Sequence, residues 1–325
     1  MNKQEILNIV REQLGNSRIQ FPSKIDFCER DGEIILFLDG GAVKNMQDDA
    51  AAFEGWILGV KAAVDRVKKD YSYTLEWPRM PSQSGHYQRF LYRVQKFNEV
   101  FGGSAGWFKI KEPLMLSDLK ISENENEIYL LNAPKTLGER LNSSDDSVEN
   151  FLENQIVKKQ DDENGLGTMF QVTLARQLPV GLFRRAVKKD NAIFTGGKSA
   201  VDLWGVRHVA EGRPGELYIF ELKAKENRKA GVLSELFFYA MLLRDEQDRR
   251  FVRKANADAE ISLEGKMIRG TKRLNAIILA PEIHPIITES VFCLLNEALA
   301  RQNIKFGFVQ MEYVMETQFR FQEKW

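Results

Sequence analysis

The chain has 325 residues, of which 43% are hydrophobic and 28% are charged, a composition that is typical of globular proteins and excludes disordered and collagen-like chains. Lys and Arg number 46, as do Asp and Glu, so the net charge of zero gives no global argument for nucleic-acid or membrane binding. Because single cores rarely grow much beyond roughly 250 residues, we expect two domains.

Cysteine and histidine usage narrows the chemistry further. Cys28 and Cys293 lack the spacing of a metal cluster and cannot form a disulfide framework, which suits a reducing compartment. His86, His208 and His284 form no HExxH motif, which argues against zinc hydrolases and histidine-based nucleases. No apolar run approaches the roughly 20 residues of a membrane span, so we expect a cytoplasmic protein without membrane contact.

Residues 1–140 alternate helical and strand patterns. In chain order the patterns predict helix Lys3–Leu14, strand Gly32–Leu38, a helix around Gln47–Lys69, strand Tyr71–Trp77 and helix His86–Phe101. Aromatic and basic side chains recur in the last of these helices, and their helical spacing favours burial over contact with nucleic acid. We predict a separate α+β domain of unknown role over residues 1–140.

A shift toward Pro, Gly, Asn, Ser and Asp between Asn132 and Ser147 predicts the domain boundary, with a second domain over residues 141–325. A capping-box pattern then opens helix Ser147–Lys159. Glu149 and Glu153 lie together beside the apolar face of this helix.

The most informative pattern is a pair of expected strands, Val201–Val206 and Leu217–Lys223, joined by a segment with the composition of a hairpin loop. Successive strand side chains point to opposite faces, so Glu221 and Lys223 share a face and Asp202 can lie alongside them. Two carboxylates are donors that Mg²⁺ accepts together with water and phosphate oxygens. The ion would polarise a phosphodiester and activate a water, and the lysine would stabilise the developing charge or orient that water.

The helix expected at Lys229–Arg244 carries Glu235 inside an otherwise apolar run, with Tyr239 one turn later on the same face. Burying an unpaired carboxylate is costly, so a nearby metal or basic group would explain Glu235. Strand Asn275–Ala280, helix Pro285–Arg301 and strand Lys305–Gln310 are expected to follow.

Together these residues resemble the PD-(D/E)xK nuclease superfamily over roughly residues 145–310. Asp202 stands where that family places its first metal-binding aspartate, Glu221-Leu-Lys223 resembles its ExK element, and Glu235 with Tyr239 resembles a QxxxY-type motif with Glu in place of Gln. The resemblance implies an α/β fold with a restriction-endonuclease-like αβββαβ core and a mixed central sheet. Either Glu153 or Glu149 matches the acidic residue that some members carry on the first core helix.

Two further lysines accompany the motif. Gly197-Lys198-Ser199 is similar to the end of a P-loop, but Ala192 stands where the earlier glycine is required, which argues against ATP binding. Lys198 either helps to hold a phosphate near Asp202 or is a solvated loop residue, and Lys225 follows the ExK element. Between residues 176 and 273, 21 Lys and Arg face 13 Asp and Glu, a basic excess that suits a phosphate backbone but also fits scattered solvation.

These patterns predict a nuclease that hydrolyses phosphodiester bonds in DNA through water activated by Mg²⁺ or Mn²⁺. Asp202 and Glu221 would bind the metal, and Lys223 would stabilise the transition state or orient the water. Glu235 would support the metal or the lysine. Two alternatives stay open: the same fold without turnover, acting as a module that binds nucleic acid or protein, and a main activity in the N-terminal half. A homodimer is also left open.

Overall fold

The computed structural model describes the chain except residues 45–48, 68–69, 105, 122–126, 133–146, 196–198, 209–214, 226, 252–262 and 316–317. The chain forms two compact units. Unit 1 contains residues 1–121, 229–235 and 283–298, and unit 2 contains residues 122–228, 236–282 and 299–325. The boundary predicted at residue 140 lies outside the described residues.

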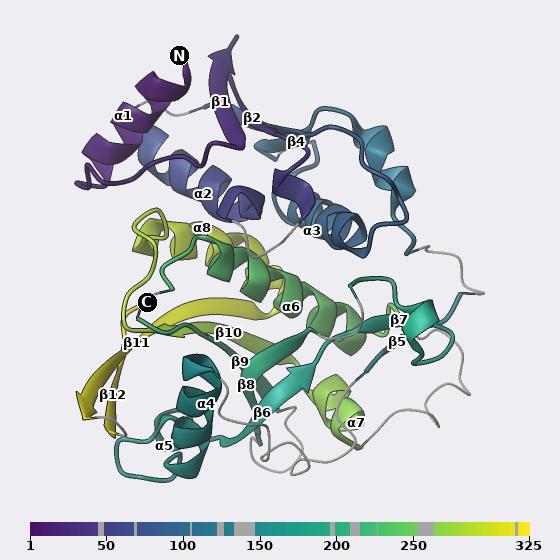
Figure 1. Ribbon diagram of the computed structural model, residues 1–325, viewed down its shortest axis with the longest axis vertical. Helices are drawn as coiled ribbons and strands as arrows, with labels where there is room; N and C mark the ends of the chain where they lie inside the picture. The colour runs from purple at the N-terminus through teal and green to yellow at the C-terminus, as the bar shows by residue number, and fades with distance from the viewer. Residues whose placement is uncertain are drawn as a thin grey trace. The chain divides into compact units, whose positions relative to one another are not determined.

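Unit 1 has a four-stranded sheet in the order β1-β2-β3-β4 (Figure 1). Its elements are α1 (Lys3–Gln13), β1 (Ile25–Arg30), β2 (Glu33–Leu38), α2 (Phe53–Val64), β3 (Ser72–Glu76), α3 (Gly85–Phe101), β4 (Phe108–Ile110) and most of α8 (Glu289–Leu299). β1 pairs with β2 in antiparallel fashion, whereas β2, β3 and β4 are parallel. Because α2 and α3 connect these parallel strands, the order is that of α/β units rather than the α+β arrangement predicted from the sequence.

The sequence predictions for unit 1 place most of its elements correctly. The helix expected around Gln47–Lys69 is the shorter α2, and β1 had not been expected. The aromatic side chains of α3, including Phe90, Tyr92 and Phe97, are buried, which confirms their assignment to a core. Within α2, a Cβ at Gly59 would overlap the side chain of Ile286, so close packing against residues 283–298 explains this glycine.

His284 belongs to this unit, and its environment predicts a pH effect. Its Nδ1 accepts a hydrogen bond from the backbone N–H of Ile286 at 3.2 Å, and its ring lies 5.2 Å from Trp56 in edge geometry. Burial lowers the pKa of His284 below the ordinary value of 6.5, against a smaller opposing effect of Asp49. Below about pH 6.5, therefore, His284 binds a proton in the unfolded chain but not in the folded chain. The free energy of unfolding consequently decreases as the pH is lowered through this range.

Urea unfolding of the wild type and of His284→Gln at about pH 7.5 and about pH 5.5 checks this. We expect the wild type to lose more stability between the two pH values than the variant does. His208→Gln, at an exposed position, is the matched control and should keep the wild-type pH dependence. An identical pH dependence in His284→Gln and the wild type would contradict the expectation.

Unit 2 has a six-stranded mixed sheet in the order β12-β11-β10-β9-β8-β6 and a small two-stranded sheet, β5-β7. Its elements are β5 (Tyr129–Leu131), α4 (Val148–Lys158), α5 (Leu166–Phe170), β6 (Thr173–Pro179), β7 (Leu182–Arg184), β8 (Ala200–Arg207), β9 (Glu216–Leu222), α7 (Leu263–Gly270), β10 (Arg273–Ala280), β11 (Ile304–Met315) and β12 (Gln318–Glu323). β6, β8 and β9 form an antiparallel meander, and β10 and β11 continue parallel to β9. Helix α6 (Gly231–Gln247) contributes residues 231–235 to unit 1 and 236–247 to unit 2.

The large sheet carries helices on both faces. On one face, Leu152 and Ile156 of α4 join a buried cluster with Leu203, Phe220 and Leu279. On the other, the ring of Phe237 from α6 stacks on that of Phe306 at 6.4 Å. Side chains alternate along a strand, so the residues next to Leu203 and Phe220 point to the α6 face. No helix among the described residues combines the length and apolarity needed to cross a membrane.

Candidate functional site

Asp202 and Glu221 are brought together by the pairing of β8 with β9. Leu203 and Phe220 form the last pair of this antiparallel ladder, and Asp202 and Glu221 are the residues one position beyond it on the two strands. The two carboxylates predicted from the sequence as metal ligands therefore belong to neighbouring strands on the α6 face of the sheet.

Hydrogen bonds hold this pair at the end of β9. The Oδ2 atom of Asp202 accepts from the backbone N–H of Leu222 at 2.8 Å, so the carboxylate is tied to the neighbouring strand. The Nζ of Lys223 lies 2.6 Å from Oε1 of Glu221. The backbone N–H of Lys223 donates to the carbonyl of Leu279 at 2.9 Å, which extends the parallel pairing of β9 with β10. The carboxyl ends of parallel strands are the common place for ligand sites in α/β sheets.

Both charged side chains of the Glu221–Lys223 ion pair are buried. Glu221 is 2% exposed and Lys223 is 9% exposed. A buried ion pair is costly to desolvate and contributes little net stability compared with apolar residues.

Helix α4 contributes two acidic residues, Glu149 and Glu153, which make different contacts. Oε1 of Glu149 accepts from the backbone N–H of Ala224 at 3.4 Å and from the amide of Asn227 at 3.2 Å, so it contacts the segment directly after Lys223. Glu153 is 1% exposed and accepts from Nε of Arg176 at 3.0 Å and from the amide of Gln177 at 2.8 Å. Glu149 is thus the acidic residue of α4 that approaches the ExK segment, and Glu153 binds α4 to β6.

Gln177 and Arg176 were not predicted as part of this region. Gln177 has a left-handed backbone conformation, with φ at 54°, which is uncommon outside glycine. It interrupts the alternation of β6 at the position opposite Asp202, between the pairs Arg176–Leu203 and Leu178–Val201. A basic residue inside an apolar strand pattern was the available signal for Arg176.

Burial raises the pKa of Glu153, and the charge of Glu149 adds to this effect. Hydrogen bonds from Gln177 and the charge of Arg176 oppose it. The raised pKa thus reports a carboxylate held within the α4 face, whereas Asp202 and Glu221 point to the other face.

The remaining predicted residues occupy different surroundings. Glu235 and Tyr239 are 6% and 4% exposed on α6, the first in the part of the helix that belongs to unit 1 and the second in the part that belongs to unit 2. Lys225 is exposed, and Lys198 lies outside the described residues. Trp204, between Asp202 and the end of β8, is buried at 1% exposure.

The donor set suits a hard divalent ion with an incomplete protein cage. Asp202 and Glu221 offer carboxylate oxygens, which Mg²⁺ and Mn²⁺ prefer. Across the described ranges, no group of three or more His, Cys, Asp or Glu side chains is arranged to hold a metal. Water and substrate phosphate oxygens would have to complete the coordination, as is usual for Mg²⁺. Comparison of the chain with protein-family models, curated proteins and solved structures gives no match.

Proposed function

We propose that unit 2 is a metal-dependent nuclease that hydrolyses phosphodiester bonds in DNA. The observation that carries the proposal is the placement of three residues at one edge of the sheet. Asp202 lies near the start of β8, Glu221 lies near the end of the adjacent strand β9, and Lys223 directly follows β9. The two carboxylates lie one position beyond the last pair of the β8–β9 ladder, and the lysine contacts Glu221 at 2.6 Å. Paired carboxylates with a buried ammonium group form a set that suits the charge of a reacting phosphodiester.

The connectivity of unit 2 supports the same proposal. Helix α4 precedes the meander β6-β8-β9, and α6 leads from β9 to the parallel strand β10. This order is compatible with the αβββαβ core that the PD-(D/E)xK resemblance implies, with α5, β7 and α7 as additional elements. In the proposed assignment, β8 carries the aspartate and β9 ends in the ExK element.

Each residue has a defined task in this proposal. Asp202 and Glu221 would hold one Mg²⁺, which when bound supplies Lewis acidity toward the scissile phosphate. Lys223 would place its positive charge beside the phosphate oxygens as negative charge develops on them. Glu149 fixes the backbone that follows Lys223 through its bond to Ala224. Glu235 stays a sequence-based candidate for supporting the metal or the lysine.

A calorimetric titration with Mn²⁺ tests the metal site directly. The wild type is expected to bind the ion, and Glu221→Gln to weaken binding by at least about tenfold, because it removes a charged ligand while keeping an acceptor for Lys223. Asp190→Asn, at an exposed position in the same unit, is the matched control and should bind like the wild type. Equal affinities for Glu221→Gln and the wild type would contradict the proposed site.

The same titration separates the nuclease from a binding module without turnover. The Lys223–Glu221 contact and the small number of clustered carboxylates favour this second candidate. A module without turnover would bind DNA yet show no Mn²⁺ binding that depends on Glu221. Linear, circular and single-stranded DNA incubated with Mg²⁺ or Mn²⁺ would then stay intact.

A further inference from the structure

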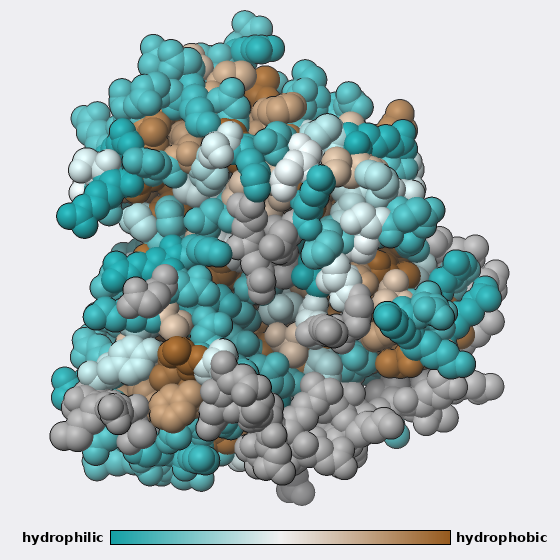
Figure 2. All heavy atoms as spheres, viewed as in Figure 1, coloured by the Kyte–Doolittle hydropathy of each residue, from teal (hydrophilic) through white to brown (hydrophobic). Residues whose placement is uncertain are grey.

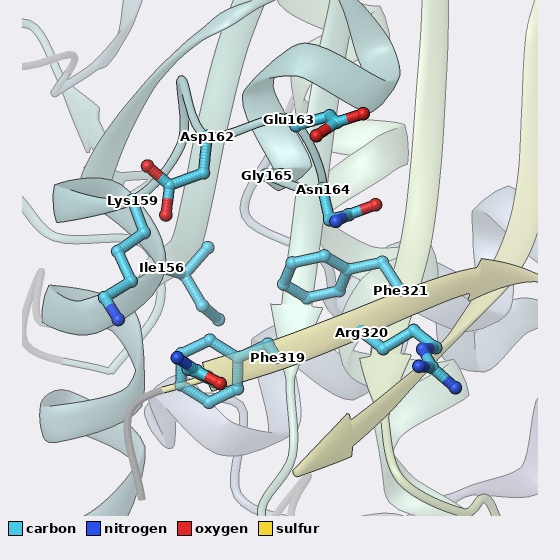
Figure 3. Close-up of a pocket in the computed structure, with 10 residues that line it drawn as sticks. Ile156, Lys159, Asp162, Glu163, Asn164, Gly165, Phe319, Arg320 and Phe321 are labelled. Atoms are coloured by element: carbon cyan, nitrogen blue, oxygen red, sulfur yellow. The ribbon is translucent and has the colours of Figure 1, made fainter. Parts of the chain in front are cut away.

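Unit 2 contains a cavity of about 420 Å³ between the end of α4, the loop that follows it and strand β12 (Figure 3). Its volume falls within the range of small-molecule sites. Residues of α4, of the loop that follows it and of β12 line the cavity, among them Ile156, Phe319 and Phe321. Figure 2 shows apolar atoms gathered on the surface between β12 and α4, at the lower left of the view.

Aromatic rings form one side of this cavity. Phe319 and Phe321 are two residues apart on β12 and so project to the same face of the strand, with ring centroids 6.1 Å apart. Tyr313, on the paired strand β11, adds a third ring 6.0 Å from that of Phe319. The three rings make a continuous ladder along the hairpin, and Tyr313 is 39% exposed.

The ladder lies on the α4 face of the sheet, where Phe319 and Phe321 pack against the buried cluster that includes Leu152 and Ile156. Burial and the nearby carboxylate of Glu149 raise the pKa of Tyr313. Glu149 in turn bonds to the backbone of Ala224, directly after Lys223. The cavity thus lies in the same unit as the proposed nuclease residues, on the opposite face of the sheet from Asp202 and Glu221.

The rim of the cavity is polar in a balanced way. Lys159 and Arg320 contribute positive charge, and Asp162 and Glu163 contribute negative charge. The amide of Asn164 provides both donors and acceptors close to Phe321 (Figure 3). An apolar, ring-lined interior under a rim of donors and acceptors matches the flat face and polar edge of a nucleobase better than it matches a phosphate or a lipid chain.

We propose that this cavity holds one unstacked base of single-stranded nucleic acid against Phe319 and Phe321. The inference rests on the proposed function and adds a substrate class, single-stranded DNA or a frayed end, to it. Every base presents a π-face, so stacking on the rings is sequence-tolerant.

Fluorescence anisotropy with a labelled oligothymidylate tests the inference. The measurement uses Asp202→Asn protein in EDTA, so that cleavage cannot interfere. When Phe319→Leu is added to the Asp202→Asn protein, the affinity for oligothymidylate is expected to fall about 5- to 150-fold, which is the loss associated with one base stacked on an aromatic ring. Phe319→Trp should retain affinity. Phe151→Leu, which alters a partly buried ring on the same core but outside the cavity, is the matched control and should bind normally.

A blunt duplex of the same length is expected to bind more weakly than the single strand. Phe319→Leu should reduce the ratio of the affinity for the single strand to the affinity for the duplex. Equal affinities for Phe319→Leu and its parent would overturn the inference, as would an equal loss in Phe151→Leu. If the wild type cleaves DNA with a KM that Phe319→Leu leaves unchanged, the base site is wrong and the nuclease stands. If binding depends on Phe319 but no metal supports cleavage, the base site stands and the nuclease is wrong.

Discussion

Asp202→Asn is expected to lower the rate of metal-dependent DNA cleavage by about 10²–10³-fold or more, the usual cost of removing one electrostatic group from a catalytic site. The substitution keeps the size of the side chain and an oxygen that can accept from the N–H of Leu222. It removes one of the two negative charges that lie one position beyond the last pair of the β8–β9 ladder. The fold should therefore persist while the affinity for the divalent ion falls. Cleavage of linear, circular and single-stranded DNA in Mg²⁺ or Mn²⁺ measures the loss.

Asp190→Asn controls for the removal of a carboxylate elsewhere in the same unit and should cleave at the wild-type rate. Circular dichroism and urea unfolding show whether Asp202→Asn is folded. A folded Asp202→Asn protein that cleaves as fast as the wild type would exclude Asp202 from the catalytic site. Cleavage that is absent from the wild type on every DNA form would exclude the nuclease altogether.

The part of the candidate site that the sequence predicted well is the part that depends on local pattern. Short apolar runs predicted both strands, and counting positions along them put Glu221 and Lys223 on one face. The hairpin connection then made Asp202 a neighbour, because consecutive strands usually pair. The structure agrees with the strand limits to within a residue or two.

The part that could not be predicted depends on contacts between distant segments. Periodicity left Glu149 and Glu153 equivalent, since they are one helical turn apart, and only the packing of α4 on the sheet separates them. The left-handed turn at Gln177 carries no sequence signal, because glutamine has no special preference for that conformation. The aromatic ladder unites Tyr313 and Phe319 across the β11–β12 hairpin, and β12 was not among the expected strands.

The division of α6 between the two units could not be predicted either, because it also depends on contacts between distant segments. Its sequence is apolar on all sides, which predicts a buried helix but does not say what each face contacts. The structure assigns Glu235 and Tyr239 to different compact units although they are one turn apart. A role for Glu235 in the nuclease site therefore has to be tested by substitution rather than inferred from the motif alone.

In unit 1, Arg93→Met is expected to lower the free energy of unfolding by about 3–5 kcal/mol, the cost of leaving a buried charge without its partner. Arg93 is 1% exposed and Glu54 is fully buried, and the guanidinium bonds the carboxylate through Nε at 2.7 Å and through a second nitrogen. It also donates to the carbonyl of Ala51 at 2.7 Å, and the hydroxyl of Ser234 donates to Glu54 at 2.6 Å. Urea unfolding followed by circular dichroism measures the change.

Arg79→Met is the matched control, because Arg79 makes the same two-pronged contact with Asp118, at 2.7 and 2.6 Å, but has a side chain that is 63% exposed. Solvent screens that pair, so its loss should change stability little. The double variant Arg93→Met with Glu54→Leu removes both buried charges and should recover most of the stability that Arg93→Met loses. Equal losses for Arg79→Met and Arg93→Met, or no recovery in the double variant, would show that desolvation of Glu54 is not what makes Arg93 necessary.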